Sequence, residues 1–107
     1  MIGRDATILI NGTTSDVSDL GNYALAGLIM PSAFTGTAIA IHASDKKAGT
    51  FVPVYDSAGN AVSLTVAASR AVGITGANAD AVASFRWLKF VSNQTETAAR
   101  LVKIVMK

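Results

Sequence analysis

Large apolar side chains recur at every second position along much of this 107-residue chain, whereas sustained helical spacing is absent. Successive side chains of a β-strand point to opposite faces of a sheet, so such alternation buries one face of each segment. Ala6, Ile8 and Ile10, for example, fall on one face of a first strand over residues 5–11. The pattern predicts an all-β fold.

Turn signals divide the chain into strands at a spacing of roughly 8–12 residues, which is typical of an antiparallel sandwich or barrel. Asn11-Gly12 is the strongest of these signals and predicts a hairpin into residues 13–17. Further strands are expected at residues 23–30, 37–43, 51–55, 62–66, 70–74, 85–92 and 100–107. About eight strands predict an antiparallel, jelly-roll-like β-sandwich that occupies a single domain, 1–107.

Two segments carry a more specific expectation. Pro53 has no backbone N–H to donate to a ladder, so the strand over residues 51–55 belongs at a sheet edge or a strand end. The alanine-rich stretch near 77–83 favours helix, and Gly76 and Asn78 suit its start. We therefore expect at most one short helical turn there.

Composition and charge restrict the partners. Half of the residues are hydrophobic but only 7% are aromatic, and a core of small side chains favours a surface that is completed by a partner. Residues 82–107 carry five basic groups against Glu96 alone. They form either a basic face for an acidic partner or spaced, solvated positions on two strands, which is the more common situation. The longest apolar stretch, residues 23–30, is far shorter than the ~20 residues of a membrane-spanning helix.

The sequence contains little that could support catalysis or hold a metal. Cysteine is absent and His42 is the only histidine, which excludes thiolate zinc sites and histidine clusters. His42 is expected on a surface or at an interface. The acidic residues stand mostly alone in turns, and Asp56 is expected to cap its own turn. We therefore expect a protein that is not an enzyme and has no cofactor and no metal site.

The segment 85–90 mixes the single tryptophan with two cations. By alternation, Arg86 falls on one face of the strand and Trp87 and Lys89 on the other, so Trp87 is either part of the core, which is the preferred interpretation, or an exposed anchor. The candidate interaction surface consists of Tyr55, Arg86, Trp87, Lys89 and Lys103. A net charge of +2 and one aromatic strand make nucleic-acid binding a poor explanation of these residues.

Three stretches resemble a group of small bacteriophage virion structural proteins of the jelly-roll decoration, or cement, type. They are YALAGLIMPSAFTGTAI at residues 23–39, VYDSAG at 54–59 and FRWLK at 85–89. The resemblance implies a protein that binds and stabilises the outer capsid surface. Its implied partners are the major capsid protein and neighbouring copies of itself in a homo-oligomer, and its implied location is the virion, assembled in the host cytoplasm.

The segments 43–45, 51–55 and 85–89 are also similar to carbohydrate-binding jelly rolls of the discoidin type. This similarity implies an alternative role as a glycan-binding module or a tail or adhesin component, with Tyr55 or Trp87 stacking on a sugar. The chain departs from that group because its predicted loops hold mainly Ala, Gly, Ser and Lys rather than aromatic side chains.

Overall fold

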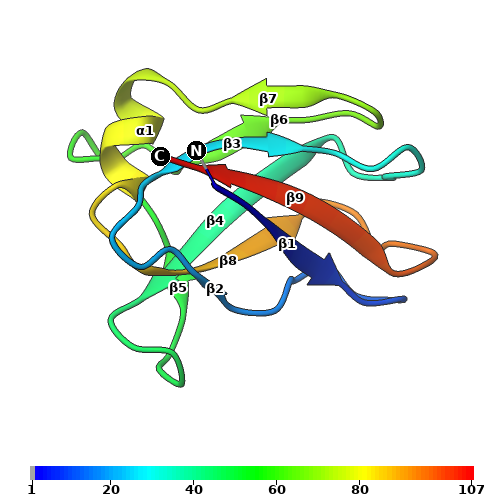
Figure 1. Cartoon of the computed structure of the whole chain (residues 1–107), viewed down its shortest axis with the longest axis horizontal. Helices are drawn as coiled ribbons and strands as arrows, with labels where there is room; N and C mark the ends of the chain where they lie inside the picture. The colour runs from blue at the N-terminus through cyan, green and yellow to red at the C-terminus, as the bar shows by residue number, and fades with distance from the viewer. Residues whose placement is uncertain (1) are drawn as a thin grey trace.

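The computed structural model describes residues 2–107, which fold into two antiparallel sheets with one short helix (Figure 1). The elements are β1 (Ile2–Ile8), β2 (Ser18–Asp19), β3 (Leu25–Ile29), β4 (Ala38–Ser44), β5 (Val52–Pro53), β6 (Ser63–Thr65), β7 (Ala71–Gly73), α1 (Gly76–Val82), β8 (Trp87–Ser92) and β9 (Arg100–Met106). The predicted all-β sandwich is confirmed, and the helix lies where a short helical turn was expected. None of the helices in the described part of the chain is long and apolar enough to span a membrane.

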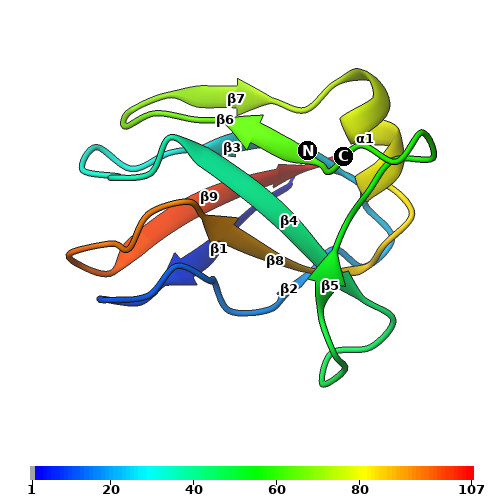
Figure 2. The same cartoon turned by 180° about the vertical axis from the view of Figure 1, so that it is seen from behind.

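The strands alternate between the two sheets in jelly-roll order. Sheet A has the order β1-β9-β3-β7, and sheet B has the order β2-β8-β4-β5, with β6 also paired to β4 (Figures 1 and 2). Every strand pair is antiparallel. Successive strands cross from one sheet to the other through most of the chain, which is the winding of a double-sheet jelly roll. Because β1 and β9 are antiparallel neighbours, the start of β1 lies beside the end of β9 (Figure 1).

Strands β5 and β6 are two parts of one edge strand. β5 pairs with the end of β4 at His42 and Ala43, and β6 pairs with its start at residues 38–40. Between them the chain leaves the sheet in a narrow turn closed by a bridge between Tyr55 and Ala61. Counted as one interrupted strand, β5 and β6 leave eight strands in residues 2–107, close to the number expected, although the sequence analysis gives 51–55 and 62–66 as two strands. Pro53 lies on this edge, as expected.

The core lies between the two sheets and contains mainly aliphatic side chains. Side chains at every second position of a strand point into this core. Leu88 and Phe90 of β8 and Val102, Ile104 and Met106 of β9 are all fully buried. Other large side chains that are almost completely buried include Ile8, Leu20, Leu28, Ile39, Ile41, Val62 and Val66. Phe90 and Phe34, 0% and 6% exposed, are the aromatic side chains of this core, so most of the packing is close contact between β-branched and leucine side chains.

The chain returns from β1 into residues 13–17, as predicted, but not through a tight two-residue turn at Asn11-Gly12. Ile8 forms an antiparallel bridge with Ser15, and the N–H of Asp16 donates to the carbonyl of Thr7 at 3.1 Å. Asn11 has a φ of 64°, but Gly12 lacks the positive φ that the second central residue of a type I′ turn requires. The chain instead turns more widely and residues 13–15 cross to sheet B, where the Ser15 N–H donates to the carbonyl of Phe90. Because β1 ends at Ile8, Ile10 is 59% exposed rather than part of the core.

Glu96 is fully buried, although the sequence places it in a loop of polar residues. Its carboxylate accepts the N–H groups of Thr35 at 3.0 Å and Gly36 at 3.2 Å and the hydroxyl of Ser92 at 3.4 Å. Arg100 donates to the same carboxylate at 3.0 Å. These bonds join the loop before β4 to the loop before β9, about sixty residues apart in the chain.

Candidate interaction surface

The register of sheet B determines which side chains of β8 face outward. Leu88 lies opposite Ala43 and points into the core, so Trp87 and Lys89 point away from it. On this outer face Trp87 lies between Ser44 of β4 and Asp19 of β2. The preferred interpretation of Trp87 as a core residue is therefore wrong. The inward positions are already taken by leucine and phenylalanine, so the indole is left partly exposed.

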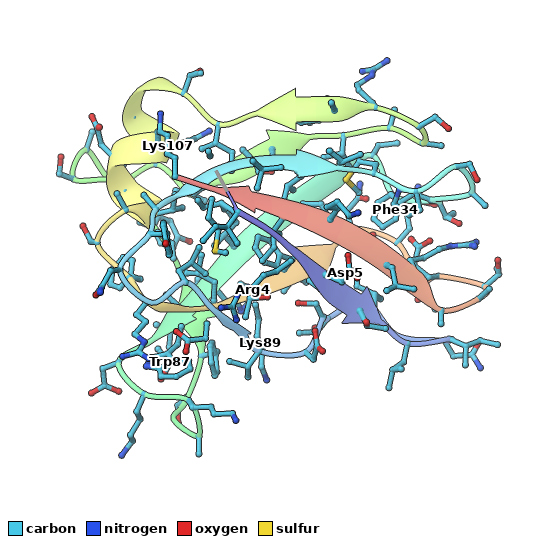
Figure 3. The ribbon with its side chains drawn as sticks, in the orientation of Figure 1. Arg4, Asp5, Phe34, Trp87, Lys89 and Lys107 are labelled. Atoms are coloured by element: carbon cyan, nitrogen blue, oxygen red, sulfur yellow. The ribbon has the colours of Figure 1, made fainter. Side chains whose placement is uncertain are left out.

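Two cations lie over aromatic rings on this face. The Arg86 guanidinium is 4.6 Å from the centroid of the Trp87 ring, and the Lys89 ammonium is 4.7 Å from that of Phe51. Both distances are within the range of cation–π attraction. We call Phe51, Arg86, Trp87 and Lys89 the basic–aromatic face. Trp87 and Lys89 are seen near the β4–β5 hairpin in Figure 3.

An ion pair orients Arg86. Its Nε and Nη2 donate to the two carboxylate oxygens of Asp19 at 2.7 and 3.1 Å. The hydrogen bond from Arg86 lowers the pKa of Asp19 to about 2, with a further contribution from the N–H of Gly21. The same contact raises the pKa of Arg86. A bidentate contact fixes the plane of the guanidinium, and this plane covers Trp87.

The β4–β5 hairpin adds further positive charge beside the basic–aromatic face. Its tip carries Lys46 and Lys47, both exposed, and it projects away from the body of the sandwich (Figures 1 and 2). Gly49 is required in this tip, since an added Cβ would lie only 2.3 Å from the Ser44 hydroxyl. His42 also lies on the outer face, opposite Lys89, and is half-buried as a surface histidine should be.

The structure does not bring all five predicted surface residues together. Arg86, Trp87 and Lys89 share one face, but Lys103 lies on the outer face of sheet A, where it pairs with Asp5 and Ile29. Tyr55 stands in the turn between β5 and β6. Sequence reasoning also omitted Phe51, because only the long-range pairing of β4 with β5 and β8 reveals its contact with Lys89.

Tyr55 belongs to a groove at one end of the sandwich. Two adjoining hollows, of about 420 and 320 Å³, share Tyr55 and Phe85 in their walls, and we call them together the Tyr55–Phe85 groove. The first lies against α1 and is lined by Ala77, Asp80, Ala81 and Ser84. The second lies at the base of the β4–β5 hairpin and is lined by Ala43, Val52, Pro53 and Val54.

The second hollow is the more apolar of the two, and it lies at the base of the hairpin that projects from the sandwich (Figure 2). Val52 is paired with Ala43, which is 4% exposed, yet Val52 itself is 56% exposed. Tyr55 and Phe85 are 58% and 40% exposed. Val52 therefore faces solvent at a position that, by its pairing with the buried Ala43, lies on the core-facing side of sheet B.

Four of the acidic residues have hydrogen-bonding partners within the fold: Asp16, Asp19, Asp56 and Glu96. Asp56 caps its own turn, as predicted, by accepting the N–H groups of Ala58 and Asn60 at 3.0 and 2.9 Å. The hydrogen bond from Asn60 and others in this turn lower the pKa of Asp56. Among residues 2–107 there is no group of three or more His, Asp or Glu side chains arranged to hold a metal ion.

Comparisons of the chain with protein-family models, with curated proteins and with solved structures found no match. The function must therefore be argued from the two surface features described above, the basic–aromatic face and the Tyr55–Phe85 groove.

Proposed function

We propose that this chain is a bacteriophage virion structural protein that attaches to the outside of the capsid through its basic–aromatic face and stabilises the shell. The resemblance of residues 23–39, 54–59 and 85–89 to virion decoration proteins supports the biological setting. The jelly-roll fold is compatible with a role on a virus particle, since many viral capsid domains have this fold. A fold alone does not define a function.

The observation that carries the proposal is the placement of Trp87. A large indole stands on the outer face of a sheet, flanked by small residues such as Ser44, and a guanidinium covers its ring. Tryptophan and arginine are the side chains that most often dominate the energy of protein interfaces. A partly exposed tryptophan held in one orientation by Arg86 and Asp19 loses little conformational freedom when a partner covers it.

The charge of the face indicates the chemistry of the partner. Lys89 lies over Phe51, and Lys46 and Lys47 lie on the neighbouring hairpin tip; within residues 2–107 none of the three forms a salt bridge, whereas Arg86 is paired with Asp19. A protein surface with an apolar recess inside a rim of Asp and Glu side chains is complementary to this arrangement. On a shell the same recess recurs at every subunit, so modest affinity at each position is sufficient when neighbouring copies are also linked.

The proposal is tested by adding the purified protein to capsids of the phage that encodes it, assembled without this protein, and by measuring co-sedimentation. We expect saturable binding by the wild type and at least a tenfold weaker binding by Trp87→Ala, since a buried interface tryptophan contributes about 2 kcal/mol or more. Circular dichroism verifies that the variant is folded. Wild-type binding by folded Trp87→Ala overturns the assignment of this face.

A matched pair of lysine variants separates this face from general basicity. Lys89→Ser removes a cation from sheet B, and Lys103→Ser removes one from the outer face of sheet A. We expect only Lys89→Ser to weaken binding and to reduce its dependence on salt. Equal effects of the two substitutions would contradict a specific face. Binding to tails but not to capsids would overturn the proposed location.

A further inference from the structure

The Tyr55–Phe85 groove carries negative charge that the proposed function does not use. Asp56 and Asp80 line its first hollow and Asp45 lines its second, and none of the residues lining either hollow is a lysine, arginine or histidine. The chain as a whole has a net charge of +2, so the groove reverses its sign locally. Exposed apolar surface beside uncompensated charge is typical of an interaction site.

The position of Asp80 is not explained by the stability of α1. Ala77, Asp80 and Ala81 are spaced i, i+3 and i+4, so they share one face of the helix, and this face lines the first hollow. Aspartate is a poor helix former, and in the last turn it meets the partial negative charge of the helix end. No basic residue in that turn offsets it, and within residues 2–107 the Asp80 carboxylate forms no hydrogen bond or ion pair. Its charge is therefore free for a partner.

Asp56 contributes a second negative charge, and its own turn fixes the position of that charge. Its Oδ1 accepts the N–H groups of Ala58 and Asn60 at 3.0 and 2.9 Å, whereas its Oδ2 has only a longer contact, 3.4 Å, from the side-chain amide of Asn60. The hydrogen bonds from Asn60 and from the rest of this turn lower the pKa of Asp56, so the carboxylate is ionised at neutral pH. One oxygen holds the turn, and the other retains capacity to accept a hydrogen bond.

Two aromatic rings form the wall that the two hollows share. Tyr55 and Phe85 are 58% and 40% exposed and line both hollows. Tyr55 follows β5 and Phe85 lies between α1 and β8, so the fold brings together two segments that are distant in the chain (Figures 1 and 2). The faces of such rings attract cations, as the nearby carboxylates do. Beyond the rings, the second hollow continues with aliphatic side chains such as Val52, which is 56% exposed.

We infer that the Tyr55–Phe85 groove binds an extended segment of another protein, with a lysine or arginine side chain in the first hollow and an aliphatic side chain in the second. The carboxylates of Asp56 and Asp80 complement the charge of the cation, and the two aromatic rings cover its alkyl stem. The first hollow, about 420 Å³, has the volume of about fourteen water molecules at ~30 Å³ each, which is ample for one long side chain. Every second side chain of an extended segment points the same way at a spacing of about 7 Å, which suits two adjoining hollows.

A basic and an aliphatic side chain suit the groove better than a metal ion or a sugar. Among residues 2–107 no three His, Asp or Glu side chains are arranged to hold a metal ion. A sugar needs hydrogen-bonding groups around its whole ring, but Val52, Pro53 and Val54 make much of the second hollow apolar. The inference goes beyond the proposed function, because it concerns a different surface and a partner of opposite charge.

The test is an NMR titration of the isotope-labelled protein with the acetylated and amidated peptide Ala-Leu-Ala-Arg-Ala. We expect saturable shifts of the backbone amides of Ala58, Ala81 and Phe85, which lie along the groove. A peptide with Glu in place of Arg is expected not to bind, and one with Ser in place of Leu is expected to bind more weakly. No saturable shift with the arginine peptide up to its solubility limit, or equal binding of the glutamate peptide, overturns the inference.

A matched pair of variants separates the groove from general electrostatic attraction. Asp80→Asn and Asp5→Asn each remove one exposed carboxylate that has no ion pair within residues 2–107, and Asp5 lies on the outer face of sheet A. We expect about tenfold weaker peptide binding by Asp80→Asn, since an ion pair beside aromatic rings is lost, and unchanged binding by Asp5→Asn. Circular dichroism verifies that both variants are folded. Equal effects of the two substitutions contradict a specific site.

Three further measurements decide between occupants. Free butylguanidinium that binds as tightly as the peptide would assign the first hollow to a small organic cation. Self-association of the wild type that is lost in Asp80→Asn, measured by sedimentation velocity, would assign the groove to the lysines of a second copy. Sugar binding on a glycan array that the arginine peptide displaces would assign the groove to a sugar. Each of these results overturns the inference of a segment from another protein.

Discussion

Residues 2–107 contain two carboxylate–guanidinium pairs of similar separation in opposite surroundings. In the Glu96–Arg100 pair, at 3.0 Å, the side chains are 0% and 13% exposed, whereas in the Asp19–Arg86 pair, at 2.7 Å, they are 34% and 56% exposed. The buried pair joins two loops of the fold, and the exposed pair holds a guanidinium over Trp87. A short ion-pair distance alone therefore does not indicate which pair stabilises the protein; burial and the other bonds of each carboxylate do.

The difference also appears in how each carboxylate is stabilised in its charged form. Burial by itself raises the pKa of Glu96, but the hydrogen bonds from Thr35, Arg100 and Gly36 outweigh it and leave the pKa below the ordinary value of 4.5. The pKa of Asp19 is lowered chiefly by the hydrogen bond from Arg86. Glu96 thus depends on several parts of the fold, whereas Asp19 depends mainly on one side chain.

The largest effect is expected for Glu96→Ala. This substitution removes a buried partner of Arg100 and leaves the N–H groups of Thr35 and Gly36 without an acceptor. Breaking a buried ion pair from one side costs about 3–5 kcal/mol, and we expect a loss of that order in the free energy of unfolding. Urea denaturation followed by circular dichroism measures it. A loss smaller than that for removal of an ordinary exposed hydrogen bond, about 1 kcal/mol, would show that the two pairs are energetically alike.

The second prediction concerns pH. The pKa of Glu96 is lower in the folded chain than in the unfolded chain, so its stabilising contribution is complete above about pH 4.5 and is lost as the pH falls through the folded pKa. We expect the stability difference between the wild type and Glu96→Gln to shrink below pH 4.5. Thermal unfolding of both proteins from neutral pH to pH 3 provides the measurement. A constant difference across that range would contradict the assignment.

Asp19→Asn is expected to change the surface rather than the stability. Exposed ion pairs contribute little to folding, so the denaturation midpoint should change much less than for Glu96→Ala. Arg86 loses its charged partner and becomes free to leave the Trp87 ring. Because Trp87 is the only tryptophan, its fluorescence reports this site alone. We expect increased quenching by acrylamide, and unchanged quenching would show that Asp19 does not position Arg86.

The smallest effect is expected for Arg86→Lys. Lysine keeps the positive charge near Trp87 but cannot form the bidentate contact that Nε and Nη2 of Arg86 make with Asp19. Stability should be unchanged, and acrylamide quenching should lie between the values of the wild type and of Asp19→Asn. Quenching equal to that of the wild type would mean that charge alone, without the planar guanidinium, is sufficient to cover the indole.

Sequence reasoning succeeded where one local rule determined the outcome. Alternation correctly placed Val102, Ile104 and Met106 in the core, and the missing N–H of Pro53 correctly placed its strand at an edge. It failed where two distant segments decided the result. The burial of Glu96 depends on the loop at Thr35 and Gly36, which no pattern near Glu96 reveals.

The surface residues show the same limit. The alternation of the segment 85–90 allowed either face to be buried, and only the fit of Leu88 and Phe90 between the sheets placed Trp87 outside. The basic residues of the last quarter were divided between both faces of the sandwich, with Lys89 on sheet B and Lys103 on sheet A. Charge counting along the chain could not make that distinction.

The interrupted edge formed by β5 and β6 affects how copies of this chain can pair when they are packed closely together. An unbroken edge strand offers a row of free backbone groups that invites another chain to extend the sheet without limit. Here the excursion from Tyr55 to Ala61 and the proline at position 53 break that row, and the opposite edge of sheet B is a strand of only two residues. Sheet B therefore offers another chain little free edge to extend, so contacts through this sheet are left to side chains, whose pairing can be specific and finite.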